Sequence, residues 1–476
     1  MKLHLLFFVV FISVFSAFGQ TVAPSPLLYS DATIAEMQRM QQAAVKSDYA
    51  YKQTGYLSNN IGSRLSGSPQ AERSVQWVAE QMRKLGLDVR LQPCMVPHWV
   101  RGEEHGELIE WDGMAPGTTQ KVFLTALGGS IATPAEGMTA DIVVVKDFDE
   151  LARLGRDKIA GKIVLFNFKF DRELQASGFG GAAYGQAVQY RFGGAMAAAR
   201  LGAVGVLVRS AGGSQNRLVH TGSMGYADGV TKIPGAAVSY EDAEKIAWLA
   251  AMGKVKIKLT LTPQTLPDAP SFNVIADLKG SEKPDEVVIV SGHLDSWDLG
   301  SGAIDDGAGV AVAMSVPALI KQLGLKPKRT IRFIAWMNEE NGGRGSAAYA
   351  AEQEKNIGNH FAALESDLGA SHPLGFYFTG KPEMAAFFAP ISKVLLAQGA
   401  AQVQLQAGGV GSDIGPLTQR GVPSFAPWFN QQSYFNYHHT AADTFDKVDP
   451  REIAEVSSVM TVLAFGLANL EQPLPR

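Results

Sequence analysis

The chain has 476 residues, more than one hydrophobic core usually spans, so two domains are expected. Its composition, with 46% hydrophobic and 18% charged residues, is that of an ordinary globular protein. The formal net charge is -4 with no long run of one sign, which argues against a nucleic-acid partner.

Residues 1–19 have the pattern of a secretory signal peptide. A short basic start, Met1-Lys2, precedes the apolar run Leu5–Phe18, and Ala17-Phe18-Gly19 supplies small residues at the two cleavage positions. The run is too short for a comfortable membrane span, although an uncleaved anchor helix is the alternative. No later segment is expected to be long and apolar enough to span a bilayer. We therefore expect a secreted or periplasmic protein with no stable membrane span after cleavage.

Cys94 is the only cysteine, so no intrachain disulfide and no cysteine-rich zinc finger can form. An exported protein without disulfides suits a bacterial periplasm or exterior. The neighbouring residues Pro93 and Met95 offer no activating base, which favours an inert, packed thiol.

Residues 25–119 are expected to begin the catalytic domain. One helix is predicted to run through Val45 with Asp31 as its cap. A second is predicted over Glu72–Leu85, where apolar residues recur at helical spacing. Asp88–Gln92 is a predicted strand that Pro93 should stop. The turn-forming residues at 116–119 mark a candidate domain boundary.

Residues 120–265 have the pattern of a smaller α/β module that contains none of the candidate metal ligands. Its expected short strands are Ile142–Val145, Lys162–Phe166 and Val204–Val208, and a long alanine-rich helix is expected over Tyr184–Leu201. We expect this module to interrupt a catalytic domain formed by residues 25–119 and 266–476.

Three buried strands of the C-terminal part each end on side chains that bind metals. The strands and the side chains that follow them are Val287–Val290 with His293 and Asp295, Thr330–Trp336 with Glu339-Glu340, and Phe361–Leu364 with Glu365-Ser366-Asp367. Ligands of open α/β sheets lie outside the carboxyl ends of the strands. Packing alone does not explain this pattern, which predicts a metal site at that edge.

Two more segments supply candidate ligands. A glycine-rich loop leads to Asp305-Asp306, and tandem histidines, His438-His439, lie in the loop Tyr437–Thr444. The sequence alone does not decide between Glu339 and Glu340, or between His438 and His439.

Charge counting supports a two-metal site. With His293, Asp305, Glu340, Asp367 and His439 as ligands, three carboxylates face two zinc ions, and one bridging hydroxide neutralises the remaining positive charge. Two metals that share a carboxylate and a hydroxide are the arrangement of two-metal hydrolases.

Five motifs together resemble the co-catalytic zinc aminopeptidase family: Gly292-His293-x-Asp295, Asp305-Asp306-Gly307, Asn338-Glu339-Glu340, Glu365-Ser366-Asp367 and His439-Thr440-x-x-Asp443-Thr444. Within it, GHLDSWD, KPKRT and LESD at 292–298, 326–330 and 364–367 are similar to the carboxypeptidase Q group. IGSRLSGSP at 61–69 is similar to the family's N-terminal entry segment. Residues 120–265 look like a protease-associated domain, the usual insert in this family.

The resemblance implies an α/β fold, with a mostly parallel sheet covered by helices on both faces (the zinc exopeptidase fold), plus the inserted smaller α/β protease-associated domain. It implies two Zn2+ per chain, a small peptide as substrate and, on this ground alone, a homodimer. Its ligand roles are a bridging Asp305, one site completed by His293 and Asp367, and the other completed by Glu340 and His439.

The same resemblance implies roles around the metals. Glu339 would be the general base, and Asp295 would hold the His293 ring in its ligating tautomer. His438 stands where some relatives carry an oxyanion-stabilising Tyr, so it is a candidate for that role, with a packed or solvent-facing histidine as the alternative.

One loop departs from the family. Residues 411–414, Gly-Ser-Asp-Ile, have Ile414 where the common Ser-Asp-His pattern has its histidine. That loop is expected to shape the pocket at most. Arg344 or Arg420 could bind a substrate carboxylate, although surface positions are equally expected.

We expect an exported di-zinc exopeptidase that hydrolyses dipeptides or short peptides with a free N-terminus. A metal-bridging hydroxide would attack, with the Glu339 carboxylate as base. The alternatives are an aminopeptidase of longer peptides, a glutaminyl cyclase with one zinc, and a non-catalytic binding protein on the same scaffold. Binding proteins of that kind typically lose ligands or the base, and all of these residues are present here.

Overall fold

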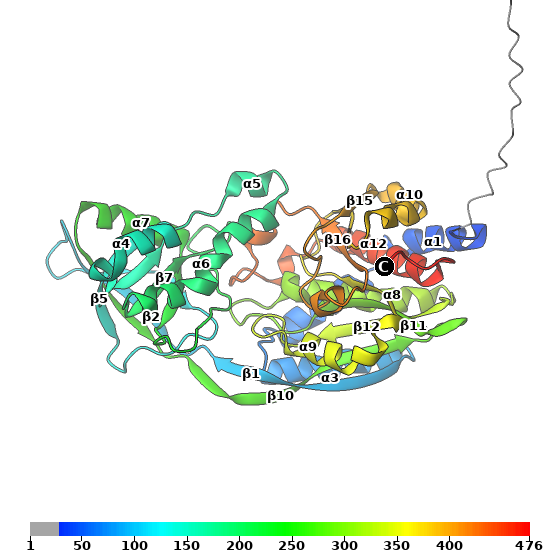
Figure 1. Ribbon diagram of the computed structural model, residues 1–476, viewed down its shortest axis with the longest axis horizontal. Helices are drawn as coiled ribbons and strands as arrows, with labels where there is room; N and C mark the ends of the chain where they lie inside the picture. The colour runs from blue at the N-terminus through cyan, green and yellow to red at the C-terminus, as the bar shows by residue number, and fades with distance from the viewer. Residues whose placement is uncertain (1–27) are drawn as a thin grey trace, which may run out of the picture.

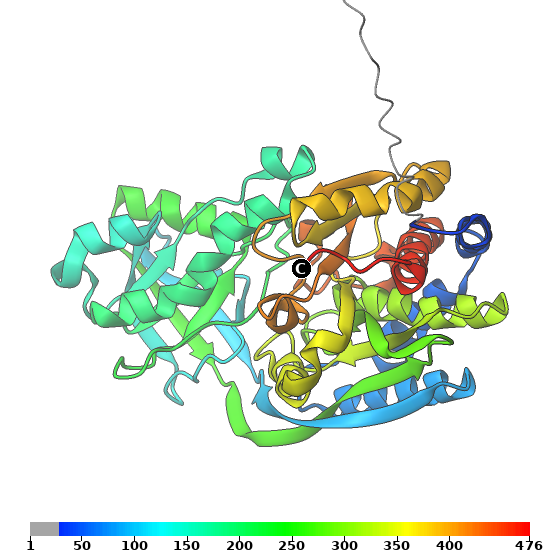
Figure 2. The ribbon, with the colours of Figure 1, turned by 45° about the vertical axis from the view of Figure 1, so that its right-hand side comes forward.

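The computed structural model describes residues 28–476, and the predicted signal peptide, residues 1–19, lies outside that range. The described chain forms two eight-stranded sheets, and Figures 1 and 2 show them in two parts that lie side by side. Two long antiparallel strands, β1 and β10, lead into and out of the second part.

The first sheet has four parallel strands at its centre, β12, β11, β13 and β16, and antiparallel pairings on both sides of them. In spatial order its strands are β1 (Asp88–Val100), β10 (Gln264–Leu278), β12 (Arg329–Trp336), β11 (Lys283–His293), β13 (His360–Glu365), β16 (Ser424–Phe429), β14 (Pro373–Thr379) and β15 (Gln402–Leu405). The helices of this part are α1 (Asp31–Ala44), α2 (Tyr49–Tyr56), α3 (Pro69–Lys84), α8 (Ala308–Gln322), α9 (Arg344–Glu352), α10 (Ala389–Leu395), α11 (Gly415–Thr418) and α12 (Pro450–Asn469).

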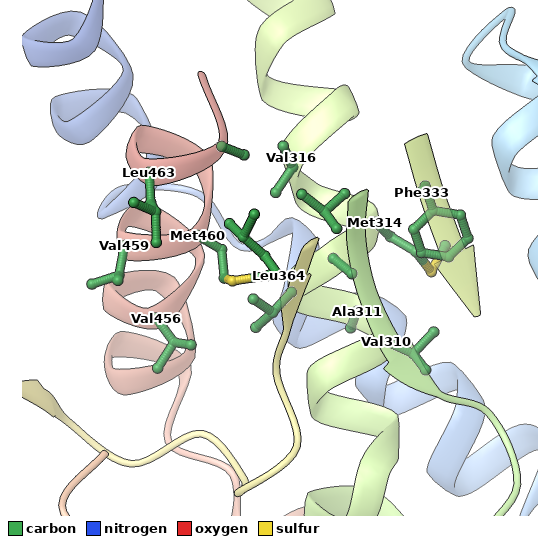
Figure 3. Close-up of a cluster of buried hydrophobic side chains, with 14 of the residues drawn as sticks. Val310, Ala311, Met314, Val316, Phe333, Leu364, Val456, Val459, Met460 and Leu463 are labelled. Atoms are coloured by element: carbon green, nitrogen blue, oxygen red, sulfur yellow. The ribbon is translucent and has the colours of Figure 1, made fainter. Parts of the chain in front are cut away.

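Side chains of the central strands alternate between the two faces of the sheet. Val290, Phe333 and Leu364 pack against α8 and α12 on one face, as Figure 3 shows for Phe333 and Leu364. Ile289 and Ile334 belong to a separate cluster with residues of α9 and α11. The predicted α/β fold, a sheet with helices on both faces, is confirmed.

Within residues 28–476, two helical segments are long and apolar enough to cross a bilayer, contrary to the sequence-based expectation. They are Ala303–Gln322, which contains α8, and α12. Both are buried in the protein, where they form much of the core in Figure 3. Helices that are apolar all round occur in the cores of large proteins as well as in membranes, which explains why length and composition alone mislead here.

Strand β1 continues through Pro93 to Val100, so the prediction that Pro93 stops the strand is wrong. β1 is an edge strand of the first sheet, where a missing N–H leaves no ladder hydrogen bond unmade. The first helix begins as predicted, but Ser30 is its cap, since the Ser30 hydroxyl accepts a hydrogen bond from the Thr33 N–H.

The second sheet is built from residues 104–261. In spatial order its strands are β3 (Gln120–Lys121), β2 (Glu104–Trp111), β9 (Val255–Leu261), β5 (Met138–Val145), β6 (Ile163–Phe166), β7 (Gly205–Arg209), β8 (Gly235–Val238) and β4 (Leu124–Ala126). Its helices are α4 (Phe148–Ile159), α5 (Arg172–Ala176), α6 (Gly180–Arg200) and α7 (Tyr240–Met252). Because β2 pairs with β3, the turn at 116–119 lies within this sheet, between two paired strands. The domain limits at 120 and 265, and the protease-associated domain, stay predictions.

Candidate metal centre

The central parallel strands of the first sheet carry the site at their carboxyl ends. β11 ends at His293, Glu339-Glu340 follow β12, Asp367 follows β13, and the loop with His439 follows β16. The chain runs from β11 through α8 to β12 on one side, and then through α9 to β13 on the other side. This reversal of direction is where α/β sheets open a crevice for ligands.

Gly292 and Asp306 fix the start of that crevice. A Cβ atom on Gly292 would lie 2.6 Å from Asp306 Oδ2 and 2.7 Å from the backbone of Gly309, so only glycine allows this approach of β11 to α8. The Asp306 carboxylate accepts hydrogen bonds from the backbone N–H groups of His293 (3.0 Å) and Gly309 (2.9 Å). Asp306 therefore ties the strand to the helix, while its neighbour Asp305 turns towards the histidines.

The other four predicted metal ligands lie around the Asp305 carboxylate. His293 Nε2 lies 3.1 Å from Asp305 Oδ1 and 3.1 Å from Asp367 Oδ1. His439 Nε2 lies 3.2 Å from Asp305 Oδ2 and 3.0 Å from Glu340 Oε2. The two oxygens of one carboxylate thus face two separate sets of donors, which is the geometry of a bridging ligand.

Two buried acceptor atoms support a cation at this place. Asp305 Oδ2 and Glu340 Oε1 have no hydrogen-bond partner within residues 28–476. Buried carboxylate oxygens are costly unless they are paired or coordinate a metal. Imidazole nitrogen and carboxylate oxygen are the donors that zinc takes in hydrolases, so the residues present fit the expected metal.

Backbone carbonyls lie beside the Nδ1 atoms of both predicted ligand histidines, and His293 is held in the tautomer that metal binding would need. His293 Nδ1 donates to the backbone carbonyl of Asp295 over 3.0 Å, which leaves Nε2 free to bind a metal. His439 Nδ1 lies 3.3 Å from the backbone carbonyl of Thr221, in the segment between β7 and β8. The Thr221 N–H in turn donates to the His439 carbonyl over 2.9 Å. The second part of the molecule therefore orients one of the ligands.

Asp295 acts differently from the expectation. Its carboxylate lies 4.0 Å from His293 Nδ1, and its backbone carbonyl, not its side chain, makes the hydrogen bond that fixes the tautomer. The carboxylate accepts instead from the backbone N–H groups of Asn338 (2.7 Å), Glu339 (3.0 Å) and Glu340 (3.3 Å). The fully buried Asp295 thus shapes the turn that carries the base and a ligand.

The turn after β12 leaves extended geometry, as adjacent glutamates facing one site require. Asn338 has φ 75°, in the left-handed region. Glu340 reaches His439, whereas the Glu339 side chain lines the neighbouring cavity. The structure therefore brings Glu340 into contact with another predicted ligand, His439, and places Glu339 in the lining of the same cavity.

Burial sets the protonation of the site. Loss of water raises the pKa of Glu339 to about 7 and that of Glu340 to about 8. Burial opposes the charged His293 ring, but the Asp367 charge and hydrogen bonds to Asp305 and Asp367 raise its pKa well above the ordinary value. Such shifts are typical of functional sites.

The metal-free protein should lose stability as the pH rises. Burial raises the pKa of Glu340 in the folded protein to about 8 from an ordinary value of 4.5. The folded protein therefore binds more protons than the unfolded chain between these two pH values. Its contribution is complete below the unfolded pKa and is lost as the pH rises through the folded one. We expect the Tm of chelator-treated protein, measured by calorimetry, to fall from about pH 5 to about pH 8. Zinc-loaded protein should lack this fall, and a Tm that rises over this range without metal would contradict the assignment.

A cavity of about 400 Å³ opens over the ligands. Its walls come from both parts of the molecule: Gly181, Tyr184, Arg191 and Ser223 from the second, and His293, Asp305, Glu339, Glu340, Asp367, Leu368, Ser412, Tyr434, Phe435, His438 and His439 from the first. The sequence analysis missed Tyr184 and Arg191, because nothing in the spacing of residues 120–265 points to this site.

The arginines proposed for substrate lie elsewhere. Arg344 is exposed and Arg420 pairs with Glu354 over 2.9 Å, and neither lines the cavity. The cation among the residues that line the cavity is Arg191, which donates to the Tyr184 hydroxyl (2.9 Å) and to the Thr221 carbonyl (3.2 Å). Its Nη1 also lies 3.2 Å from His439 Nδ1.

The loop that departs from the family is anchored beneath the cavity. The Glu365 carboxylate accepts from the backbone N–H groups of Ser412 (2.9 Å) and Ile414 (2.8 Å). Ile414 is fully buried in the cluster under α9 and α11. The position of the missing histidine is therefore a core position here, and Ser412 is the residue of this loop that reaches the cavity.

Comparisons with known proteins agree with this geometry. Residues 273–464 match the model of peptidase family M28. The chain is 39% identical to carboxypeptidase Q of Bos taurus over 429 residues, which cover 90% of this chain and 87% of that protein.

Two solved structures share the fold. A peptidase M28 precursor from Shewanella amazonensis SB2B is 37% identical, with a TM-score of 0.88 over 94% of this chain and 99% of that one. A zinc aminopeptidase from Bacillus subtilis is 21% identical, with a TM-score of 0.63 over 90% of this chain and 98% of that one, which shows the fold alone. The chain belongs to peptidase family M28 and is a metallopeptidase.

Proposed function

We propose that the chain is an exported di-zinc exopeptidase that hydrolyses dipeptides or short peptides with a free N-terminus. The observation that carries the proposal is the Asp305 carboxylate, which faces His293 with one oxygen and His439 with the other. Export follows from the pattern of residues 1–19, which lie outside the described residues.

Zinc is the metal that the donor set fits. Asp305 would be shared, with His293 and Asp367 completing one site and Glu340 and His439 the other. The zinc aminopeptidase of Bacillus subtilis has this fold, which supports the same metal here. When bound, the two ions supply a lowered water pKa and a polarised scissile carbonyl.

Glu339 is the group that moves the proton. Its carboxylate lines the cavity, and its backbone N–H is held by Asp295. A pKa raised to about 7 by burial lets it take a proton from the attacking water near neutral pH and return it to the leaving amine.

His438 is placed to act on the carbonyl oxygen. Its Nε2 lies 3.4 Å from Asp305 Oδ2 and its ring lines the cavity. A donor at this position would stabilise the negative charge that develops on the substrate oxygen.

The cavity favours a small substrate. About 400 Å³ is near the lower end of the range for small-molecule sites, and walls from both parts of the molecule enclose it. The name of carboxypeptidase Q, to which the chain is 39% identical, fits an exopeptidase. A dipeptide has both of its termini next to the scissile bond, which reconciles a carboxypeptidase name with recognition of a free N-terminus.

A dipeptide library tests the proposal. We expect the purified, zinc-loaded protein to hydrolyse unblocked dipeptides, to lose this activity with a chelator, and to regain it with zinc. N-acetylated peptides should resist, and amidated or longer peptides separate a dipeptidase from an aminopeptidase. Activity that survives metal stripping would reject the proposal, and a cyclised product from a Gln-leading peptide would indicate a glutaminyl cyclase instead.

A further inference from the structure

A histidine from the second part of the molecule lies directly behind His438. His220 Nε2 is 3.2 Å from His438 Nδ1, and the His220 side chain is fully buried. The backbone N–H of His220 donates to the Ser210 hydroxyl over 3.0 Å, and that hydroxyl donates to the Val238 carbonyl at the end of β8. His220 is thus fixed to the second sheet and directed at the catalytic part.

One buried ring nitrogen without a hydrogen-bond partner indicates where the protons lie on His220 and His438. His220 Nδ1 is buried and has no hydrogen-bond partner in the described chain. An N–H at that nitrogen would be a buried donor without an acceptor, which is strongly unfavourable. The proton of His220 therefore lies on Nε2, and this Nε2–H donates to His438 Nδ1.

The tautomer of His438 follows from that of His220. Because His438 Nδ1 accepts a hydrogen bond, the proton of the His438 ring lies on Nε2. That N–H is directed to the metal edge of the cavity, 3.4 Å from Asp305 Oδ2. The surroundings of His439 differ, since its Nδ1 lies 3.3 Å from the Thr221 carbonyl and 3.2 Å from Arg191 Nη1, and its Nε2 faces the carboxylates of Asp305 and Glu340.

We propose that His220 is a positioning residue that fixes His438 as a hydrogen-bond donor to the substrate carbonyl oxygen. The inference rests on the proposed peptidase function. It gives His438 a task that differs from the proposed ligand role of His439, whose Nε2 faces the carboxylates of Asp305 and Glu340. His438 is a donor because its Nε2 carries the proton.

The packing around His438 leaves this orientation fixed. Its ring stacks on the His439 ring, with centroids 3.7 Å apart and planes 17° from parallel. Tyr184 meets it edge-on at 5.0 Å, and Tyr434 lies 5.1 Å away. A ring held on three sides keeps its donor in place without reorganisation during the reaction, which is the property that makes such donors effective.

Substitutions at His220 test the proposal. His220→Leu removes the donor, whereas His220→Gln keeps an amide N–H near the position of Nε2. We expect His220→Leu to lower kcat on the best library dipeptide by at least about tenfold with little change in KM, and His220→Gln to recover most of the loss. Zinc content should match that of the wild type in both variants.

His360 provides a matched control. It is also buried and hydrogen-bonded, to the Tyr349 hydroxyl over 2.8 Å, but it lies at the start of β13, away from the cavity. His360→Leu should lower the Tm and leave kcat unchanged. An equal kcat in the wild type and His220→Leu, a His220→Gln variant no better than His220→Leu, or loss of zinc from His220→Leu would each overturn the positioning role.

A spectroscopic measurement separates this inference from the proposed function. NMR of histidine ring nitrogens distinguishes the two tautomers, and a His438→Gln variant identifies the His438 signals. We expect His438 of the zinc-loaded wild type to be protonated on Nε2 and this preference to be lost in His220→Leu. A wild type with this tautomer but no dipeptide hydrolysis would refute the peptidase proposal alone, whereas an Nδ1-protonated His438 would refute the inference.

Discussion

Glu339→Gln is expected to abolish most turnover while the protein keeps its metals. The substitution preserves the shape of the side chain but removes the group that accepts a proton from water. Because Glu339 stands beside the ligands and not among them, zinc content should equal that of the wild type. General bases contribute roughly 10²–10⁴-fold to rate, so kcat should fall by about that factor. Dipeptide hydrolysis and metal analysis on the same preparation measure both effects.

The adjacent residue supplies the control. Glu340 Oε2 lies 3.0 Å from His439 Nε2, so Glu340→Gln should weaken the second metal site and lower the zinc content. The Glu339→Gln variant would then lose activity with its zinc retained, whereas the Glu340→Gln variant would lose activity together with zinc. If Glu339→Gln kept its turnover, or lost zinc as Glu340→Gln does, Glu339 could not be the base.

Asp295→Ala is expected to be the most damaging substitution outside the ligands. Removal of the carboxylate leaves the buried N–H groups of Asn338, Glu339 and Glu340 without their acceptor. Each unsatisfied buried donor costs about 1–3 kcal/mol, so the Tm should fall sharply. The released turn would also misplace the base and a ligand, and activity should fall roughly 10–100-fold or more.

Two further variants make this test specific. Asp295→Asn keeps the volume but turns one acceptor oxygen into a donor that faces N–H groups, so it should be nearly as harmful as Asp295→Ala. Ser66→Ala removes a hydroxyl that donates to Asp295 Oδ2 over 3.0 Å and accepts from Asn338 Nδ2 over 3.1 Å, but it leaves the carboxylate in place and should cost only about 1–2 kcal/mol. Thermal unfolding and kcat provide the comparison. An Asp295→Ala variant as stable as the wild type would show that the turn does not depend on this carboxylate.

Much of the metal centre could be predicted because its parts follow buried strands. Three strands end on histidine and carboxylate, and parallel strands bring such ends to one edge of a sheet. The residues His293, Asp305, Glu340, Asp367 and His439 do lie together. Their roles as ligands stay a proposal, but their proximity is a property of the fold.

The finer contacts could not be predicted, because they depend on where backbone atoms come to lie. The sequence shows an Asp two residues after a His, but it does not show that the carbonyl reaches Nδ1 while the carboxylate holds the next turn. His220 and Thr221 are more than 200 positions before His439, and no pattern in their neighbourhood points to a metal. Strand β1 can likewise continue through Pro93 only because β1 lies at the edge of the sheet, and the position of a strand in the sheet is known only from the assembled fold.

The stretch from His220 to Ser223 touches both ligand-bearing loops. The Thr221 N–H donates to the His439 carbonyl, and the Ser223 hydroxyl donates to the Glu340 carbonyl. A shortened protein that joined residues 25–119 directly to 266–476 would keep all the predicted ligands and Glu339. It would lack the hydrogen bonds that hold the backbone carbonyls of His439 and Glu340. We therefore expect the part built on the first sheet to be inactive by itself, because removal of the second sheet would also remove these contacts with the candidate metal centre.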